Sequence, residues 1–236
     1  MLKICVFAYD FPHRKSTDFL LEISKYDPVS MVIAAPYEKL MVPESQERIA
    51  VRGNNVLDPC DVAGLLNIPY VVVPHRSERC LEILRKRNFD VGMVAGARIL
   101  PKSVIDCFRM GIVNLHPGLL PENRGLDNIK WAVYLNLPQY VTAHYINEKV
   151  DSGNLICKEV VDVALDDTWF DMNNKVYAKQ VEMLGAVLSH VHNSMDFPVL
   201  DGGEQRSAIP RELEIEAYLH FEEYKQRYHQ IKERYI

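Results

Sequence analysis

The chain has 236 residues, with 48% hydrophobic and 25% charged side chains, a formal net charge of -5 and a pI of about 5.9. These values are typical of a soluble globular protein that buries its core without disulfides. The sequence contains no basic tract, which argues against a nucleic acid as the main partner.

The five cysteines are scattered along the chain and form no CxxC pair. An odd number without paired spacing indicates neither a disulfide framework nor a zinc site, so we expect free thiols and no metal. The apolar run at residues 2–9 is too short for a signal peptide, and no apolar segment is long enough to span a bilayer. We therefore expect a cytoplasmic protein that does not bind a membrane.

Short β-branched runs alternate with helix-like segments through the first half of the chain. The expected strands are residues 2–9, 29–35, 70–74, 91–95 and 111–115. The expected helices run from a cap at Ser16 to about Lys25, over residues 60–67, from Ser77 to Arg87 and over residues 102–108. Residues 38–59 have no clear period, and we expect a long surface loop that covers a substrate or lacks order.

Continuous apolar strands separated by helices predict a Rossmann-like α/β domain, whose mostly parallel sheet is covered on both faces. No G-x-G-x-x-G follows the first strand, so a dinucleotide site is not supported. Ligands of such sheets bind beyond the carboxyl ends of the strands.

The second half of the chain begins with an expected helix at residues 127–135 and two strands at 140–147 and 154–164, separated by a turn at 149–153. Thr168 and Asp171 resemble a capping box for a helix that continues to about Ser189. We expect a main domain over residues 1–193, followed by a turn-rich linker and a C-terminal helix over 194–236.

The C-terminal helix carries an aromatic stripe along one face. Its members are Phe221, Tyr224, Tyr228, Ile231 and Tyr235. This stripe packs either on the body of the protein or on a second subunit, which leaves a homodimer open.

The end of the fifth strand carries the candidate chemistry. Alternation along a strand places Asn114 and His116 on the same side. The amide can stabilise an oxyanion and the imidazole can hold or deliver a proton, a combination that suits attack on a carbonyl. Asp151, in a glycine-containing turn, is the carboxylate best placed to orient the imidazole. On pattern alone, Asn-x-His at a strand end is equally a structural turn former.

Residues 92–160 resemble the catalytic core of the 10-formyltetrahydrofolate-dependent formyltransferases, which act on glycinamide ribonucleotide, methionyl-tRNA and amino sugars. The matching pieces stand in the family's order. They are Ile99-Leu100-Pro101, Asn114-Leu115-His116-Pro117 with Leu119-Leu120-Pro121, Arg124-Gly125, Trp131-Ala132, Val141-Thr142-Ala143-His144 and Val150-Asp151-Ser152-Gly153.

The resemblance implies a Rossmann-like formyltransferase catalytic domain that uses 10-formyltetrahydrofolate as formyl donor and needs no metal. It implies Asn114, His116 and Asp151 as the catalytic trio, and His144 as a packing or hydrogen-bonding residue behind them. It also implies that the folate is held, mainly through backbone groups, by two segments. Their residues are Gly96, Arg98, Ile99 and Leu100 after the fourth strand, and Val150 and Gly153 beside the catalytic aspartate.

Two positions depart from the family pattern. Gly118 stands where the family usually has Ser, and Asn128 stands where a Pro is common. Candidate substrate contacts are Arg124 and the basic turn that contains His13, Arg14 and Lys15, although a solvated turn is an equal reading. The glycinamide ribonucleotide enzymes have a glycine-rich turn at that place, so their substrate fits this chain less well.

The substrate expectation follows by elimination. The methionyl-tRNA enzymes resemble this core but carry a large basic C-terminal domain, whereas the residues after 210 are not basic overall. We expect an N-formyltransferase that acts on a small amine, with a nucleotide-linked deoxyaminosugar as the leading choice. Glycinamide ribonucleotide formylation, hydrolysis of formyl-folate and a folate- or sugar-binding module without turnover stay open.

Overall fold

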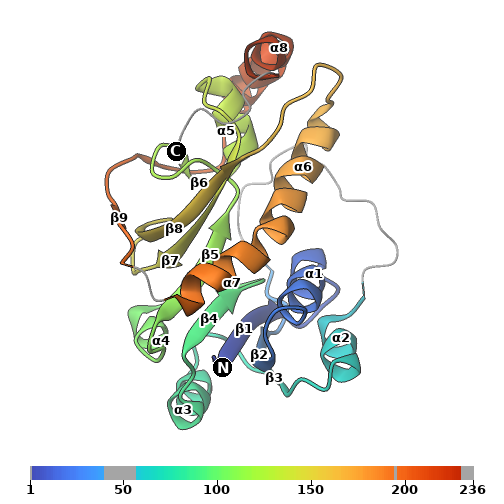
Figure 1. The fold of residues 1–236 in the computed structure, drawn as a ribbon. Coiled ribbons are helices and arrows are strands. Elements are labelled where there is room, and N and C mark those ends of the chain that lie inside the picture. The colour runs from blue at the N-terminus through green and yellow to red at the C-terminus, as the bar shows by residue number, and fades with distance from the viewer. Residues whose placement is uncertain (1, 40–56, 194–195, 230–236) are drawn as a thin grey trace.

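The computed structural model describes residues 2–39, 57–193 and 196–229 (Figure 1). Its main sheet has eight strands in the order β3-β2-β1-β4-β5-β7-β8-β9. The strands are β1 (Ile4–Tyr9), β2 (Val29–Ala35), β3 (Tyr70–Val72), β4 (Val91–Val94), β5 (Gly111–His116), β7 (Tyr140–Ile146), β8 (Gly153–Val160) and β9 (Val199–Leu200). A separate parallel pair joins β6 (Arg124–Gly125) to β10 (Gln205–Arg206).

The first five strands pair in parallel, whereas β7, β8 and β9 run antiparallel to their neighbours. The prediction of an α/β, Rossmann-like domain with a mostly parallel sheet is confirmed. Strand β5 lies inside the sheet, bonded to β4 on one side and to β7 on the other. The end of β5 is therefore a fixed platform for the side chains that it carries.

Eight helices are present in the described residues. They are α1 (Arg14–Ile23), α2 (Pro59–Leu65), α3 (Glu78–Arg87), α4 (Lys102–Ile105), α5 (Asn128–Tyr134), α6 (Trp169–Glu182), α7 (Leu184–His192) and α8 (Arg211–Tyr228). The expected caps at Ser77 and at the Thr168–Asp171 capping box are confirmed.

Several expected boundaries were wrong, three of them by a clear margin. Helix α1 is capped by His13, whose side chain accepts a hydrogen bond from the Ser16 amide. Ser16 lies inside the helix, and its hydroxyl oxygen accepts a hydrogen bond from the Tyr9 amide. The expected helix from Thr168 to Ser189 is divided into α6 and α7 at Met183, although backbone hydrogen bonds continue across that residue. Strand β1 also begins at Ile4 rather than at Leu2.

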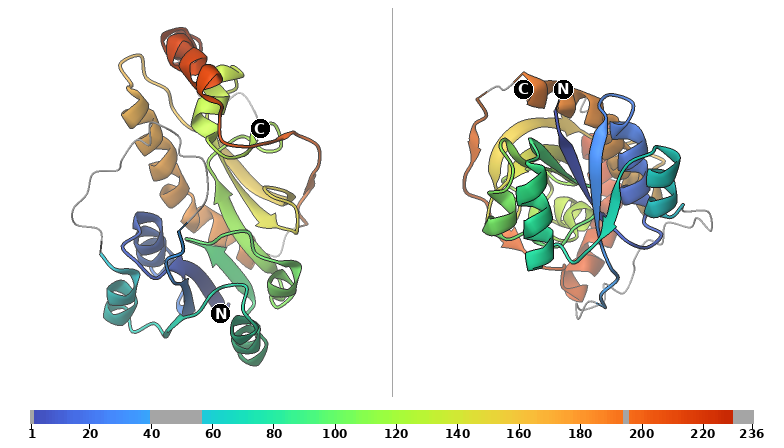
Figure 2. Two further views of the ribbon diagram at one scale, coloured as in Figure 1. Left: turned by 180° about the vertical axis from the view of Figure 1, so that it is seen from behind. Right: turned by 90° about the horizontal axis from the view of Figure 1, so that it is seen from below.

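The core has two parts, one on each face of the sheet (Figure 2). On one face, α1, α6 and α7 pack on a cluster that includes Phe19, Val176 and Val187. On the other face, α3 and α4 pack on a smaller cluster that includes Leu84 and Val104. Apolar contact on both faces explains why the strands read as nearly continuous hydrophobic runs.

The C-terminal segment is packed against the rest of the chain. Strand β9 pairs with β8, and α8 lies on α5 (Figure 1). Phe221, Tyr224 and Tyr228 are buried, and the two tyrosine hydroxyls donate to the carbonyls of Leu137 and Asn136 at 2.7 and 2.6 Å. In its described part the aromatic stripe thus packs on the body.

Several expectations fall outside these observations. Ile231, Tyr235 and most of the expected loop at 38–59 lie outside the described residues. The domain division after residue 193 and the homodimer stay predictions. No helix among the described residues is long and apolar enough to cross a membrane.

Candidate active site

Strand β5 presents Asn114 and His116 at its end because its side chains alternate between the two faces of the sheet. Val113 and Leu115 point into the core beneath α1 and α6, and Ile112 packs in the cluster beneath α3 and α4. Asn114 and His116 follow Ile112 on its face, where the apolar cluster ends. The strand therefore delivers an amide and an imidazole to one place.

Asp151 meets His116 from the turn between β7 and β8. His116 Nδ1 lies 3.2 Å from Asp151 Oδ1, and the two side chains are only 3% and 14% exposed. The second carboxylate oxygen accepts the Gly125 amide at 2.9 Å. Asp151 has φ 46°, a left-handed conformation that Asp tolerates better than most residues.

The Asp151 carboxylate is held in its ionised form. Burial alone would raise its pKa, but the hydrogen bond and charge of His116, together with the Gly125 amide, outweigh burial and lower the pKa below the usual value. An ionised carboxylate can both orient the imidazole and stabilise a positive charge on it. The predicted trio is thus brought together, while its catalytic role stays a prediction.

Asn114 is oriented by His144, which lies opposite it on β7. Asn114 Nδ2 is 3.4 Å from His144 Nε2, and His144 Nδ1 is 3.1 Å from the Ser152 carbonyl. Burial, reinforced by the charge of His116, lowers the pKa of His144 to about 4. The neutral ring therefore donates from Nδ1 to the carbonyl and accepts the amide at Nε2, as expected for a hydrogen-bonding residue behind the trio.

The second ring nitrogen of His116 is also engaged. Nε2 lies 2.8 Å from the Asn123 carbonyl and 3.0 Å from Asn128 Nδ2. Sequence reasoning missed both contacts as functional ones. In the sequence, Asn128 stands out only as a departure from the family pattern, and nothing distinguishes Asn123 from a turn residue.

Comparison of the sequence with family models identifies the family of this chain. A family model described as "Formyl transferase" matches residues 69–188, half of the chain. The chain belongs to the formyl transferase family. The match contains the whole of β5, the Asp151 turn and both positions that depart from the family pattern.

Sequence relatives of this formyl transferase family member include two methionyl-tRNA formyltransferases. That of Agathobacter rectalis is 31% identical over 159 residues, which cover 64% of this chain and 51% of the relative. That of Syntrophus aciditrophicus is 33% identical over 181 residues, which cover 75% of this chain and 55% of the relative. The chain thus spans about half the length of these curated relatives.

Solved structures of the same fold include a phosphoribosylglycinamide formyltransferase from Anaplasma phagocytophilum, with TM-score 0.64 and 20% identity over 87% of this chain and 97% of that one. A 4-N formyltransferase from Francisella tularensis has TM-score 0.62 and 22% identity over 92% of this chain and 87% of that one. At these identities the likeness shows the fold alone.

In this formyl transferase family member the basic turn before α1 is engaged with the protein itself. His13 caps α1, and burial followed by the charge of Lys15 lowers its pKa to about 4. Arg14 pairs with Asp18 at 3.4 Å and lies over the Tyr177 ring. His13 and Arg14 are thus each bonded to other parts of the protein, and their predicted role in substrate binding stays a prediction.

Lys15 turns toward the end of β5. Its Nζ donates to the Leu115 carbonyl at 3.2 Å and to Gln180 Oε1 at 2.9 Å. Burial lowers the pKa of Lys15 to about 8, an effect that the negative charge of Asp151 partly offsets. Lys15 therefore supports the site from behind the strand, and a direct substrate contact stays a prediction.

Arg124 holds the turn that carries Asp151. Its guanidinium donates to the Val150 carbonyl at 2.7 and 3.2 Å, and to the carbonyls of Gly202 and Gly203 at 3.0 and 3.2 Å. These contacts tie the β7–β8 turn to the segment between β9 and β10. Arg124 therefore has a structural role in holding the Asp151 turn, and its predicted role in substrate binding stays a prediction.

The two predicted folate segments flank the trio in the sequence. At Gly96, a Cβ would lie 2.8 Å from the Tyr9 ring, and at Gly153, with φ 119°, it would lie 2.0 Å from the Tyr145 carbonyl oxygen, so both positions require glycine. Arg98 donates to the Glu38 carbonyl at 2.6 Å. Ile99 is 60% exposed whereas Leu100 is buried, which leaves Ile99 available to an apolar ring.

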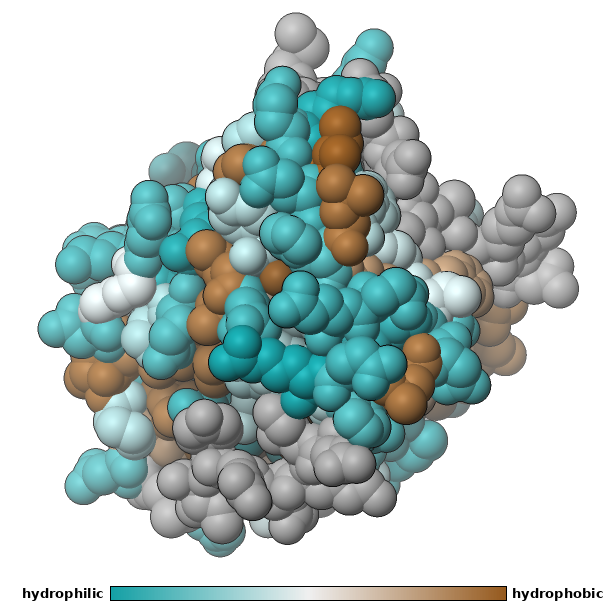
Figure 3. Space-filling view, turned by 90° about the horizontal axis from the view of Figure 1, so that it is seen from above, coloured by the Kyte–Doolittle hydropathy of each residue, from teal (hydrophilic) through white to brown (hydrophobic). Residues whose placement is uncertain are grey.

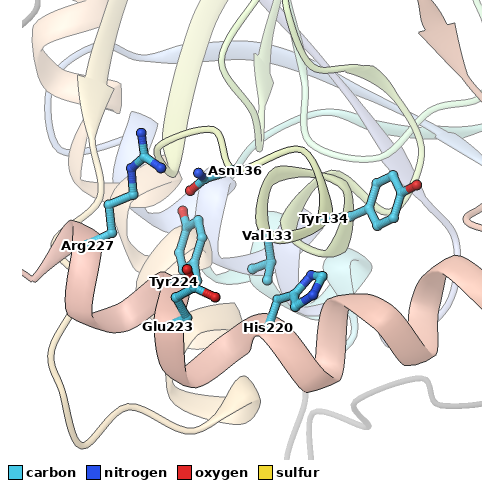
Figure 4. Close-up of a pocket in the computed structure, with 7 residues that line it drawn as sticks. All are labelled: Val133, Tyr134, Asn136, His220, Glu223, Tyr224 and Arg227. Atoms are coloured by element: carbon cyan, nitrogen blue, oxygen red, sulfur yellow. The ribbon is translucent and has the colours of Figure 1, made fainter.

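The folate roles of Gly96, Arg98, Ile99, Leu100, Val150 and Gly153 stay predictions. A cavity of about 250 Å³ between α5 and α8 is lined by other residues, among them His220, Glu223 and Arg227 (Figure 4). Viewed from above, the end of the molecule toward which β5 points is largely hydrophilic, with hydrophobic areas between (Figure 3).

Proposed function

We propose that the protein is an N-formyltransferase that moves a formyl group from 10-formyltetrahydrofolate to a small amine, with a nucleotide-linked deoxyaminosugar as the substrate. The observation that carries the proposal is the His116–Asp151 pair at the end of β5, 3.2 Å apart, with Asn114 on the same face of the strand. Membership of the formyl transferase family supports the same chemistry.

The donor supplies an activated formyl carbon attached to a nitrogen that can leave. Asn114, held by His144, presents an amide N–H to the negative charge that develops on the formyl oxygen. His116 is paired with Asp151, and its protonated ring would stabilise the same charge electrostatically. Both groups are fixed before substrate arrives, so little reorganisation is needed at the moment of reaction.

Asp151 is the base that the site offers. Its lowered pKa keeps it ionised at neutral pH, and at 14% exposure it can reach bound water. Asp151 accepts, directly or through water, the proton that the substrate amine loses as its nitrogen bonds to the formyl carbon. That proton is returned to the folate nitrogen as the old carbon–nitrogen bond breaks, so the reaction is balanced without a metal.

The choice of an amino sugar rests on charge and on fold likeness. Helix α8, which covers α5, carries five glutamates against three Lys and Arg residues, so this surface does not attract a polyanionic tRNA. A sugar N-formyltransferase from Shewanella shares the fold, with TM-score 0.60 and 18% identity over 87% of this chain and 77% of that one.

Methionyl-tRNA is the second candidate substrate, because the sequence relatives carry that name. Glycinamide ribonucleotide is disfavoured by the turn Asp10–Lys15, which reads DFPHRK without glycine. A hydrolase would use water in place of the amine, and a binding module would bind folate without turnover.

The test supplies 10-formyltetrahydrofolate with each amine in turn and follows tetrahydrofolate release. Release only with a nucleotide-linked aminosugar supports the proposal. Release without any amine identifies a hydrolase, and release with methionyl-tRNA or glycinamide ribonucleotide alone assigns the enzyme to that substrate. Binding of the folate without tetrahydrofolate release under any of these conditions would contradict the assignment of the protein as an enzyme.

A further inference from the structure

The contacts on the Nε2 side of His116 come from Asn123 and Asn128. Asn128 Nδ2 lies 3.0 Å from His116 Nε2 and 3.0 Å from the Asn123 carbonyl oxygen, and these two acceptors are 2.8 Å apart, so the amide donates between them. Asn123 Nδ2 in turn donates to the Asn128 carbonyl at 2.8 Å. The two asparagines therefore lock each other, and all of these groups are buried.

The direction of these hydrogen bonds decides where the imidazole carries its proton. When the ring is neutral, Asp151 at Nδ1 requires a donor, and the Asn128 amide at Nε2 requires an acceptor. The tautomer with hydrogen on Nδ1 satisfies Asp151 and Asn128. It leaves Nε2 and the Asn123 carbonyl oxygen as two acceptors 2.8 Å apart, and the Asn128 amide is the donor that lies within 3.0 Å of both. When the ring is charged, Nε2–H donates to the Asn123 carbonyl, 2.8 Å away, and the Asn128 amide keeps that carbonyl as its acceptor.

Gly118 provides the space for this arrangement. A Cβ at residue 118 would lie 2.9 Å from His116 Nε2 and 2.9 Å from the Asn123 carbonyl oxygen, closer than real Cβ atoms approach. Both of the chain's departures from the family pattern, Gly118 and Asn128, thus meet at one ring nitrogen. A serine at position 118 would displace the ring or the carbonyl that accepts from it.

We propose that Asn128 is a positioning residue that holds the proton of neutral His116 on Nδ1, facing Asp151, and that Gly118 is required because it leaves room for the contact. The other charged or titratable group that faces the ring is His144, whose neutral side chain is occupied by Asn114 and Ser152. Asn128 is the one amide donor at Nε2 among the described residues.

Nuclear magnetic resonance of protein labelled with ¹⁵N-histidine measures the position of the proton directly. The His116 signals are assigned by their loss in His116→Gln, and no substrate is needed. In the unsubstituted protein with a neutral ring, we expect Nδ1 to carry the hydrogen and Nε2 to be unprotonated. A neutral ring with its hydrogen on Nε2 would overturn the proposal.

Asn128→Leu removes the donor but keeps the branching at Cγ, and Asn128→Asp replaces the donor with an acceptor. In either variant we expect the hydrogen of the neutral ring to move toward Nε2, where the Asn123 carbonyl is left without its amide donor. Gly118→Ala should shift both ring signals, whereas the controls Asn193→Leu, at an exposed helix end, and Gly64→Ala, in open space, should not. Unchanged His116 signals in a folded Asn128 variant would overturn the proposal.

The kinetic arm rests on the proposed function. We expect Asn128→Leu to lower kcat about tenfold, the rate equivalent of one hydrogen bond, with KM changed less than about twofold. A loss confined to KM would contradict a positioning role. If the protein moves no formyl group but the ring signals behave as expected, the proposed function fails and the positioning of His116 stands.

Discussion

Asp151→Asn isolates the charge of the carboxylate from its place in the fold. Asparagine adopts the left-handed conformation of residue 151, φ 46°, as readily as aspartate does. Its side-chain oxygen can still accept the Gly125 amide, which now contacts the carboxylate at 2.9 Å. The turn should therefore persist while the negative charge beside His116 is lost.

The size of the effect follows from the distance. Unit charges 3.2 Å apart attract by about 5 kcal/mol at an effective dielectric constant of about 20. Burial of the pair offsets part of this attraction, and about half, roughly 2.7 kcal/mol, corresponds to about a hundredfold in rate. We expect kcat for tetrahydrofolate release to fall by about that factor.

Stopped-flow or steady-state measurement of tetrahydrofolate release gives kcat, and thermal unfolding checks the fold. Asp106→Asn is the matched control, because that carboxylate pairs with Lys102 on the surface with 57% of its side chain exposed, and such pairs contribute little. A kcat of Asp151→Asn within threefold of the unsubstituted enzyme, with an unchanged unfolding temperature, would refute the assignment of Asp151.

Three further predictions concern the supports of the site. Arg124→Ala should lower the free energy of unfolding by about 2 kcal/mol or more in urea, because it leaves the Val150 carbonyl without its charged donor, and an unchanged midpoint would contradict the clamp. The free energy of unfolding should fall as the pH drops from about 6.5 toward 4, because His144 binds a proton in the unfolded chain but stays neutral where it is buried in the folded protein. In urea titrations at several pH values, His144→Gln should reduce this dependence on pH. Phe221→Ala should lower the free energy of unfolding by about 3–5 kcal/mol, because the ring is buried and stacked on Trp169. Leu219→Ala, on the exposed face of α8, should change it little.

Much of the fold could be predicted because its signals are local. Continuous apolar strands separated by helices gave the α/β class, and the capping residues Ser77 and Thr168 marked two helix starts correctly. The trio could be placed because Asn114 and His116 share a strand face, and because the motif that contains Asp151 matches the family pattern.

What the sequence did not predict depends on contacts between distant residues. Serine is a common N-cap residue, but the Ser16 hydroxyl oxygen accepts a hydrogen bond from the Tyr9 amide instead of capping α1. Arg124 binds carbonyls that lie 78 and 79 residues further along the chain, and no local pattern announces such a clamp. The bonds of Asn128 to His116 arise in the same way, from a turn that folds back over the end of β5.

The central claim is that the end of β5 catalyses formyl transfer from 10-formyltetrahydrofolate to an amine. The most direct measurement incubates the protein with the donor and a nucleotide-linked deoxyaminosugar, follows tetrahydrofolate release and identifies the product by mass spectrometry. We expect release that requires the amine, a product heavier by one formyl group, and loss of both in His116→Gln. Equal release without the amine, or an unmodified sugar after full release, would contradict the claim.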